Sequence, residues 1–349
     1  MQKTKQPSII NIKKHNLKIQ NIFNLNTTIM NPPPTTTTLI LTILLFINTT
    51  TSSKSNQCGP TTNRDPQNIQ HNKITVLING FSESRISILQ SNAATYALSP
   101  LVSSVLVLWG NPTTPPRVIT ELAQNLSSFS DTIFLHRNPS SSLNDRFLPR
   151  LNDIKTDAVL VCDDDVEVDA ESFEFAFRVW GVNRERIVGF FARSHDVDLN
   201  RKEWVYTVHP DRFSIVLTKF MLLKSDYLFR YSCEGGHHMA EMRKIVDSVR
   251  NCEDILMNFV VADATNVGPI LVGAKRVRDY GDARNDEGKV SSGLSGRKGE
   301  HRKNRGWCIT EFHRILGRMP LRYSYGKVVD SIGEQGLCRK GGRLVFCDQ

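Results

Sequence analysis

Between residues 74 and 162 the sequence alternates short apolar runs with amphipathic stretches, and this alternation constrains the fold more than any other feature. The stretches between the runs, at 85–98 and 117–126, have the apolar spacing of helices. The runs themselves are short and rich in β-branched residues, as expected of buried strands: 74–78, 102–108, 132–135 and 158–162. The alternation predicts an α/β domain whose mostly parallel sheet is covered by helices, an arrangement common in nucleotide-binding domains.

Shorter patterns continue after residue 165. Helices are expected at 169–180, 253–262 and 308–316, and short strands at 187–191, 204–208, 214–217 and 270–272. Segment 275–305 contains ten basic and five acidic residues and almost no large apolar ones, so it is predicted to be a mobile loop.

The charge is unevenly distributed along the chain. Its 349 residues include 44 Lys and Arg against 35 Asp and Glu, for a net charge of +9. With 40% hydrophobic and 23% charged residues, the composition excludes disordered, collagenous and multi-span membrane proteins. Seven basic residues precede Asp65, the first acidic one, and segment 275–305 adds five net positive charges. The rest is slightly acidic, which argues against nucleic acid as a partner.

The first fifty residues predict membrane targeting. Five lysines precede the apolar run at 39–47, which spans a membrane only if the flanking threonines join it. The long basic stretch favours an uncleaved signal anchor over a cleaved signal peptide, with the N-terminus in the cytosol and the body in the lumen. We expect a cytosolic basic tail at 1–34, a signal anchor at 35–50, a stem linker at 51–72 and one globular domain at 73–349.

Three aspartates, Asp163, Asp164 and Asp165, directly follow the predicted strand at 158–162. In parallel sheets ligands bind beyond the carboxyl ends of the strands. Adjacent carboxylates repel one another, and a hard divalent cation such as Mg²⁺ or Mn²⁺ relieves that repulsion. The pattern indicates a metal-bridged diphosphate, and the alternative is a solvated acidic turn.

Several other features allow two interpretations. Glu253 and Asp254 open a predicted helix, where acidic residues favour the helix dipole, but either carboxylate could also lie beside a reacting group. Trp109, after the second strand, could stack on a base or fill the end of the core. His237 and His238 lack the spacing of a zinc site. Of seven cysteines, Cys162 lies in an apolar run and is predicted to be buried and free, and the pairing of the others is left open.

The ordered motifs of the body resemble glycosyltransferase family 64, the exostosin-like retaining domain. The matching segments are NDRF at 144–147, DDD at 163–165, FAFRVW at 175–180, CEDILMNF at 252–259 and MPL at 319–321. The resemblance implies a GT-A fold, a Mn²⁺-dependent nucleotide-sugar donor and retention at the anomeric carbon. It implies that Asp165 binds the metal, that Asp254 is the catalytic carboxylate and that Cys252 and Cys308 form a disulfide. The donor contacts that it implies are Arg85, Asn111, Asn144, Arg146, Asp163, Asp164 and Arg305.

Within the family, the chain is most similar to short members that include a plant glycosylinositol phosphorylceramide mannosyltransferase. This implies a Golgi membrane enzyme, single-pass and type II, that transfers mannose from GDP-mannose to that sphingolipid in the lumen. Two alternatives remain: transfer of N-acetylglucosamine or N-acetylgalactosamine from a UDP-sugar to a proteoglycan linkage, and a catalytically silent adhesion or scaffold protein. The expected partners are the nucleotide-sugar donor, a glycolipid or glycan acceptor and, through the anchor, the membrane.

Overall fold

The computed structural model describes residues 58, 68–281, 298–330, 337–340 and 342–346. All of them belong to the unit Thr50–Gln349. The predicted tail at 1–34 and signal anchor at 35–50 lie outside the described residues, as does most of the stem at 51–72. None of the helices in the described part of the chain combines the length and apolarity needed to cross a membrane.

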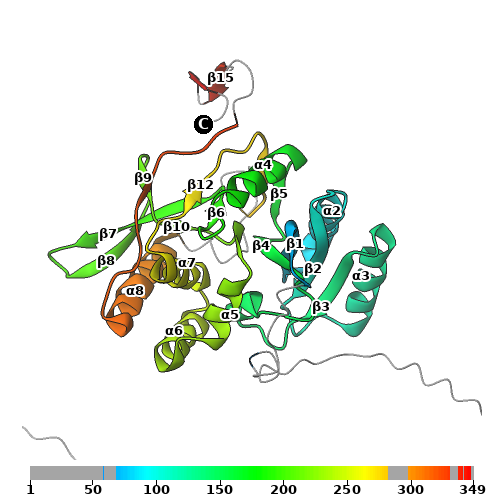
Figure 1. The fold of residues 1–349 in the computed structure, drawn as a ribbon, viewed down its shortest axis with the longest axis horizontal. Helices are drawn as coiled ribbons and strands as arrows, with labels where there is room; N and C mark the ends of the chain where they lie inside the picture. Colours follow the sequence, from blue (N-terminus) through cyan, green and yellow to red (C-terminus); the bar gives the residue numbers. More distant parts are fainter. Residues whose placement is uncertain (1–57, 59–67, 282–297, 331–336, 341, 347–349) are drawn as a thin grey trace, which may run out of the picture. The chain divides into compact units, whose positions relative to one another are not determined.

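A seven-stranded sheet forms the centre of this unit (Figure 1). The strand order is β12-β6-β11-β4-β1-β2-β3, and only β11 runs antiparallel to its neighbours. The strands are β1 (Gln70–Gly80), β2 (Val102–Trp109), β3 (Ile133–Arg137), β4 (Thr156–Asp163), β6 (Val188–Gly189), β11 (Phe220–Lys224) and β12 (Ile270–Leu271). The predicted α/β class with a mostly parallel central sheet is confirmed.

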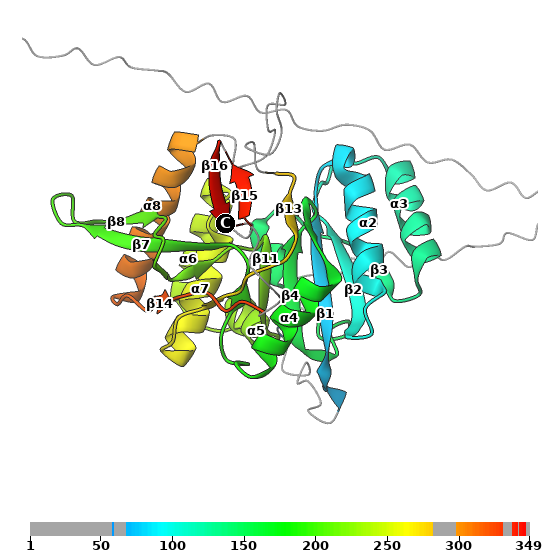
Figure 2. The same ribbon diagram turned by 90° about the horizontal axis from the view of Figure 1, so that it is seen from above.

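Helices cover both faces of the sheet. Leu89, Leu122 and Phe173 lie in one apolar cluster with residues of the central strands, and they come from α2 (Ile86–Ala97), α3 (Pro116–Phe129) and α4 (Ala170–Gly181). In Figure 2, α2 and α3 lie beside β2 and β3. The helices of the second cluster are α5 (Asp226–Cys233), α6 (Gly236–Val249), α7 (Glu253–Thr265) and α8 (Lys298–Leu316).

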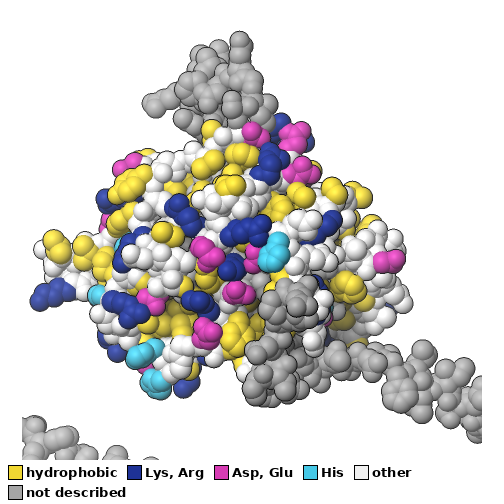
Figure 3. Space-filling view, viewed as in Figure 1, with side chains coloured by type: hydrophobic (Ala, Val, Ile, Leu, Met, Phe, Trp, Pro, Cys, Tyr) yellow, Lys and Arg dark blue, Asp and Glu magenta, His cyan; other side chains and the backbone are white. Residues whose placement is uncertain are grey.

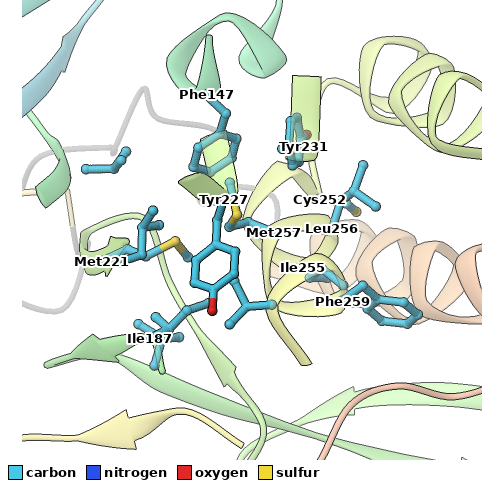
Figure 4. Packing of buried hydrophobic residues seen from close by; sticks show 14 of the residues in the cluster. Phe147, Ile187, Met221, Tyr227, Tyr231, Cys252, Ile255, Leu256, Met257 and Phe259 are labelled. Atoms are coloured by element: carbon cyan, nitrogen blue, oxygen red, sulfur yellow. The ribbon is translucent and has the colours of Figure 1, made fainter. Parts of the chain in front are cut away.

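The second cluster fixes α7 against the sheet. Figure 4 shows Met257 and Ile255, which come from α7, in one apolar cluster with Tyr227 and Met221. Nine of the 13 residues of α7 are buried, including its first residues, so the start of this helix is a rigid support for the side chains that it carries. Burying a large apolar side chain stabilises a fold by roughly 1.5–3 kcal/mol.

Smaller strands surround the main sheet. β7 (Ala192–Asp198) pairs with β8 (Glu203–Thr207) and β10 (Ile215–Val216). The remaining two-stranded pairs are β5 (Val166–Val168) with β13 (Val277–Asp279), β9 (Arg212–Phe213) with β14 (Ser324–Tyr325), and β15 (Leu337–Lys340) with β16 (Arg343–Phe346). Short 3₁₀ helices occur at η2 (Glu83–Arg85) and η3 (Leu143–Phe147).

The predicted loop at 275–305 is wrong at both of its described ends. β13 lies in its first part and pairs with β5, and α8 begins at Lys298, ten residues before the predicted start of the last helix. Polar strand residues and the basic first turns of α8 carry little apolar periodicity, so the sequence pattern did not reveal them. Residues 282–297 lie outside the described part.

Burial decides the role of Trp109 and agrees with the prediction for Cys162. Trp109 is fully buried and its Nε1 donates to Thr114 Oγ1 at 3.0 Å, so it fills the end of the core rather than stacking on a ligand. Cys162 is buried and free, as predicted.

Candidate active site

The acidic triad lies where the order of the parallel strands reverses. The chain passes from β1 to β2 and β3 on one side and then returns to β4 on the other side of β1. Such a switch point opens a crevice at the carboxyl ends of the two central strands. Asp163 is the last residue of β4 and is the register partner of Asn79 on β1. The strand topology therefore places the three aspartates at the edge where a ligand binds.

Arg85 connects the end of β1 to the triad. Its guanidinium lies 3.3 Å from Asp164 Oδ1 and also pairs with Asp165 Oδ2. Burial raises the pKa of Asp164 to about 7 and that of Asp165 to about 6, although Arg85 opposes both shifts. Asp164 Oδ2 is buried and has no hydrogen-bond partner among the described residues. One arginine therefore does not neutralise this cluster.

A second ion pair lies close to Asp165. Lys219, in the turn before β11, pairs with Asp279 at the end of β13. The Tyr280 N–H donates to the backbone oxygen of Asp165 at 2.8 Å. A Cβ on Gly281 would collide with Asp165 Oδ2, so a larger residue at this position would displace the carboxylate. Sequence reasoning missed Lys219 and Asp279, and the polar composition of 275–305 concealed Asp279.

Arg146 links the triad to the N-terminus of α7. It lies in η3, and its Nη1 is 3.1 Å from Asp163 Oδ1 and 3.3 Å from Glu253 Oε1. Burial raises the pKa of Glu253 to about 7, against the opposing effect of Arg146. A bridge between two carboxylates from distant elements holds the strand end and the helix start at a fixed spacing.

Asp254 and Arg305 form the most buried ion pair of the site. Arg305 Nη2 donates to Asp254 Oδ2 at 2.6 Å and Nη1 to Asn251 Oδ1 at 2.9 Å. The guanidinium also lies over the Tyr206 ring, 4.4 Å from its centroid. Both side chains are at most 6% exposed, so the attraction acts in a low-dielectric environment.

The described part of the chain contains two disulfides, and one of them joins two helices of the site. Cys252, immediately before α7, is bonded to Cys308, one turn after Arg305 on α8, as the resemblance implied. Cys58 is bonded to Cys233 at the end of α5, a pairing that the sequence left open. Closing a loop of 56 residues stabilises a fold by about 4 kcal/mol in the chain-entropy model.

Two expected donor contacts do not face this cluster. Asn144 Nδ2 donates to Asp247 Oδ1 at 2.9 Å, and its Oδ1 accepts from the Tyr231 hydroxyl at 2.5 Å, so its amide faces α5 and α6. Asn111 Oδ1 accepts from the backbone N–H and the hydroxyl of Thr113 and closes a local turn. The structure brings together the other predicted residues, namely Arg85, Arg146, Asp163, Asp164, Asp165, Asp254 and Arg305.

The donor set suits a hard divalent cation. Among the described residues no group of three or more His, Cys, Asp or Glu side chains is arranged as a complete metal cage. Mg²⁺-like ions need only one or two protein carboxylates when substrate phosphates and waters supply the remaining ligands. The unpaired Asp164 oxygen and the raised pKa of Asp165 show uncompensated carboxylate density at this edge.

Basic and acidic side chains are mixed on one face of the molecule. The face shown in Figure 3 has Lys and Arg interspersed with Asp and Glu, without a broad region of one sign. This distribution differs from the continuous basic stripe typical of nucleic-acid-binding domains.

A family model for the glycosyl transferase family 64 domain matches residues 74–333. The chain belongs to glycosyl transferase family 64. It is therefore a glycosyltransferase, and the acidic triad with its surrounding arginines lies inside the matched segment.

Relatives within the family differ in how much of their length they share with this chain. Glycosyltransferase family protein 64 C3 of Arabidopsis thaliana is 61% identical over 84% of this chain and 90% of its own length. Glycosylinositol phosphorylceramide mannosyl transferase 1 of the same plant is 30% identical over 74% of this chain and 76% of its own. Exostosin-1 of Mus musculus is 37% identical, over 53% of this chain and only 24% of its own length.

Proposed function

We propose that this glycosyltransferase transfers mannose from GDP-mannose to glycosylinositol phosphorylceramide, with retention at the anomeric carbon and with Mn²⁺ bound at the acidic triad. The observation that carries the proposal is that three arginines lie around the acidic triad at the carboxyl ends of the central strands. Burial leaves the carboxylates of this triad only partly neutralised. Arg85, Arg146 and Arg305 surround the place where a diphosphate would meet a cation held by Asp165. The acceptor comes from the mannosyltransferase relative, which matches over three quarters of its own length.

The residues on the two sides of the site have different tasks. Asp165 would hold the cation, with Asp164 and Asp163 beside it, and the bound cation would act as a Lewis acid toward the diphosphate. Arg305 supplies a fixed positive charge as negative charge develops on the departing diphosphate. Asp254, held by Arg305 and by its own helix N-terminus, stabilises positive charge at the anomeric carbon.

We assign the catalytic domain to the Golgi lumen, with the segment at 35–50 as a type II signal anchor. The lysines ahead of the apolar run support this orientation. The two disulfides support an oxidising compartment, because such bonds persist in the secretory pathway and are rare in the cytosol.

A second candidate is transfer of N-acetylhexosamine from a UDP-sugar to a proteoglycan linkage. The identity to exostosin-1, 37% against 30% for the mannosyltransferase, favours it, whereas the small share of exostosin-1 that is covered opposes it. A catalytically silent scaffold is disfavoured because Asp165, Asp254 and Arg305 are all present and buried.

A panel of donors and acceptors tests the proposal. The full chain is incubated with GDP-mannose, UDP-N-acetylglucosamine or UDP-N-acetylgalactosamine, with Mn²⁺, and with either the glycolipid or a proteoglycan-linkage acceptor. We expect mannosylated glycolipid whose new linkage has the configuration of the donor by NMR. Transfer from a UDP-sugar to the proteoglycan acceptor would establish the alternative, and neither transfer nor donor hydrolysis would establish a silent protein.

A further inference from the structure

The β7–β8 hairpin carries apolar side chains into solvent at its outer end. Figures 1 and 2 both show this hairpin extending away from the rest of the unit. Val197 and Val205 are 48% and 41% exposed, and Leu199, in the turn between the strands, is 79% exposed. Exposed apolar residues that are scattered singly are ordinary, whereas a group at the end of a projecting element indicates a contact surface.

The two valines lie on opposite faces of the hairpin. Residues that pair across an antiparallel ladder share a face, and successive residues of a strand alternate between the faces. Val197 pairs with Trp204, whereas Val205 pairs with Asp196. A stable protein partner covers about 800 Å² of one continuous surface. A narrow tip that is apolar on both faces is instead suited to enter a layer that surrounds it, such as the interfacial region of a bilayer.

The turn pairs its own polar groups. The Asp198 carboxylate accepts from the backbone N–H groups of Asn200 and Arg201, at 3.0 and 3.1 Å, and lies 3.8 Å from the Arg201 guanidinium. Such pairing lowers the cost of taking backbone N–H groups out of bulk water. Arg201 and Lys202 are balanced by Asp198 and Glu203, so the tip has no net charge. Its attraction to a membrane therefore depends on apolar burial rather than on the charge of the lipids.

The base of the hairpin is fixed to the active site. The Tyr206 ring, on β8, lies against the Arg305 guanidinium, 4.4 Å from its central carbon. Trp204 donates from its backbone N–H to Thr310 Oγ1 and from Nε1 to His313 Nδ1, both at 2.9 Å, and both acceptors belong to α8. The strand between Tyr206 and the turn is roughly 17 Å long. A bilayer that holds the tip therefore holds Arg305 at a set height above it.

We propose that the outer half of the hairpin, residues 197–205, inserts into the bilayer interface and presents the active site to acceptors anchored in the same bilayer. Transfer of the three exposed apolar side chains out of water drives the insertion. The polar head group of a sphingolipid acceptor then reaches the site along the hairpin. The inference rests on the proposed function for its lipid acceptor.

Fluorescence from the tip tests the insertion directly. Leu199→Cys carries an environment-sensitive label, and the full chain is combined with phosphatidylcholine vesicles that contain quencher lipids. Leu98→Cys, 85% exposed at the end of α2, is the matched control, and the wild type treated with the label gives the background. We expect a blue shift and about threefold quenching at position 199 only, unchanged when phosphatidylserine is added. No quenching at position 199, or equal quenching at both positions, would overturn the proposal.

Leu199→Asp separates insertion from catalysis. Transfer to the glycolipid in vesicles should fall about tenfold, because a carboxylate resists leaving water, while transfer to the soluble head-group glycan stays within about twofold. Leu98→Asp should change neither rate. Equal losses on both acceptors would make the hairpin a structural part of the site and overturn the proposal.

Self-association of the wild type that Leu199→Asp abolishes would assign the tip to a second copy of the chain, and would also overturn the proposal. Quenching at position 199 by a chain that transfers no mannose would reject the proposed function but keep the insertion. Mannose transfer to the glycolipid without quenching would do the reverse.

Discussion

The two carboxylate groups of the site differ in how their charge is compensated. Asp164 and Asp165 share Arg85 and remain partly unneutralised, with pKa values that burial raises to about 7 and about 6. Asp254 has Arg305 to itself, in a pair that is at most 6% exposed. The first group is suited to acquire a cation together with the donor. The second is already balanced and rigid, as a group that acts on developing charge should be.

The largest expected effect comes from the balanced pair. Asp254→Asn should lower kcat about 10³-fold and leave the dissociation constant of the donor within about threefold, because the carboxylate acts on the transition state. Steady-state kinetics and donor titration measure the two quantities. Asp263→Asn, which loses a surface pair with Arg318 on the same helix, is the control. If Asp254→Asn weakened donor binding as much as it lowered kcat, the two carboxylate groups would not have separate roles.

The two disulfides are expected to differ in their effects: both stabilise the fold, but only Cys252–Cys308 aligns residues of the site. Cys252→Ser with Cys308→Ser should lower the free energy of unfolding by about 4 kcal/mol and also lower kcat, because Arg305 precedes Cys308 by one turn. The Cys58–Cys233 bond joins no residues of the site, so the double variant Cys58→Ser with Cys233→Ser should lower the stability and leave kcat unchanged. Thermal unfolding and kcat are measured for both double variants. Equal effects on kcat would show that the Cys252–Cys308 bond does not align the site.

The partly neutralised group should control the metal. Asp165→Asn is expected to weaken Mn²⁺-dependent donor binding about 10²-fold, because one charged ligand is lost while the nearby cations Arg85 and Lys219 remain. Titrations with and without Mn²⁺ separate this effect from general loss of affinity. Asp157→Asn, at the opposite end of β4, is the control. Unchanged Mn²⁺ dependence would move the metal away from Asp165.

The smallest effect is a pH dependence of stability at Glu253. Burial raises the pKa of this carboxyl from 4.5 to about 7, so the folded state favours its protonated form. The wild type should therefore lose stability relative to Glu253→Gln as the pH rises from about 4.5 to about 7, by about 2 to 3 kcal/mol. Thermal unfolding at several pH values measures the difference between the two proteins. A difference that stays constant with pH would contradict the raised pKa.

The sequence predicted the half of the site that is local in the chain. The strand before Asp163 and the triad itself could be read from short apolar runs and adjacent carboxylates. The positions of Lys219, Asp279 and Gly281 beside Asp165 could not be predicted. They depend on the pairing of β5 with β13, which are more than a hundred residues apart in the sequence. Asn144 shows the converse limit: its residue type matched a donor contact, but the packing of α5 and α6 uses all of its amide.

Manganese binding measured by electron paramagnetic resonance tests the division between the two carboxylate groups most directly. Free Mn²⁺ is titrated with the full chain in the presence of GDP, for the wild type, Asp165→Asn and Asp254→Asn. The account predicts that Asp254→Asn binds Mn²⁺ like the wild type and that Asp165→Asn loses most of its binding. Retained binding in Asp165→Asn, or loss in Asp254→Asn alone, would contradict it.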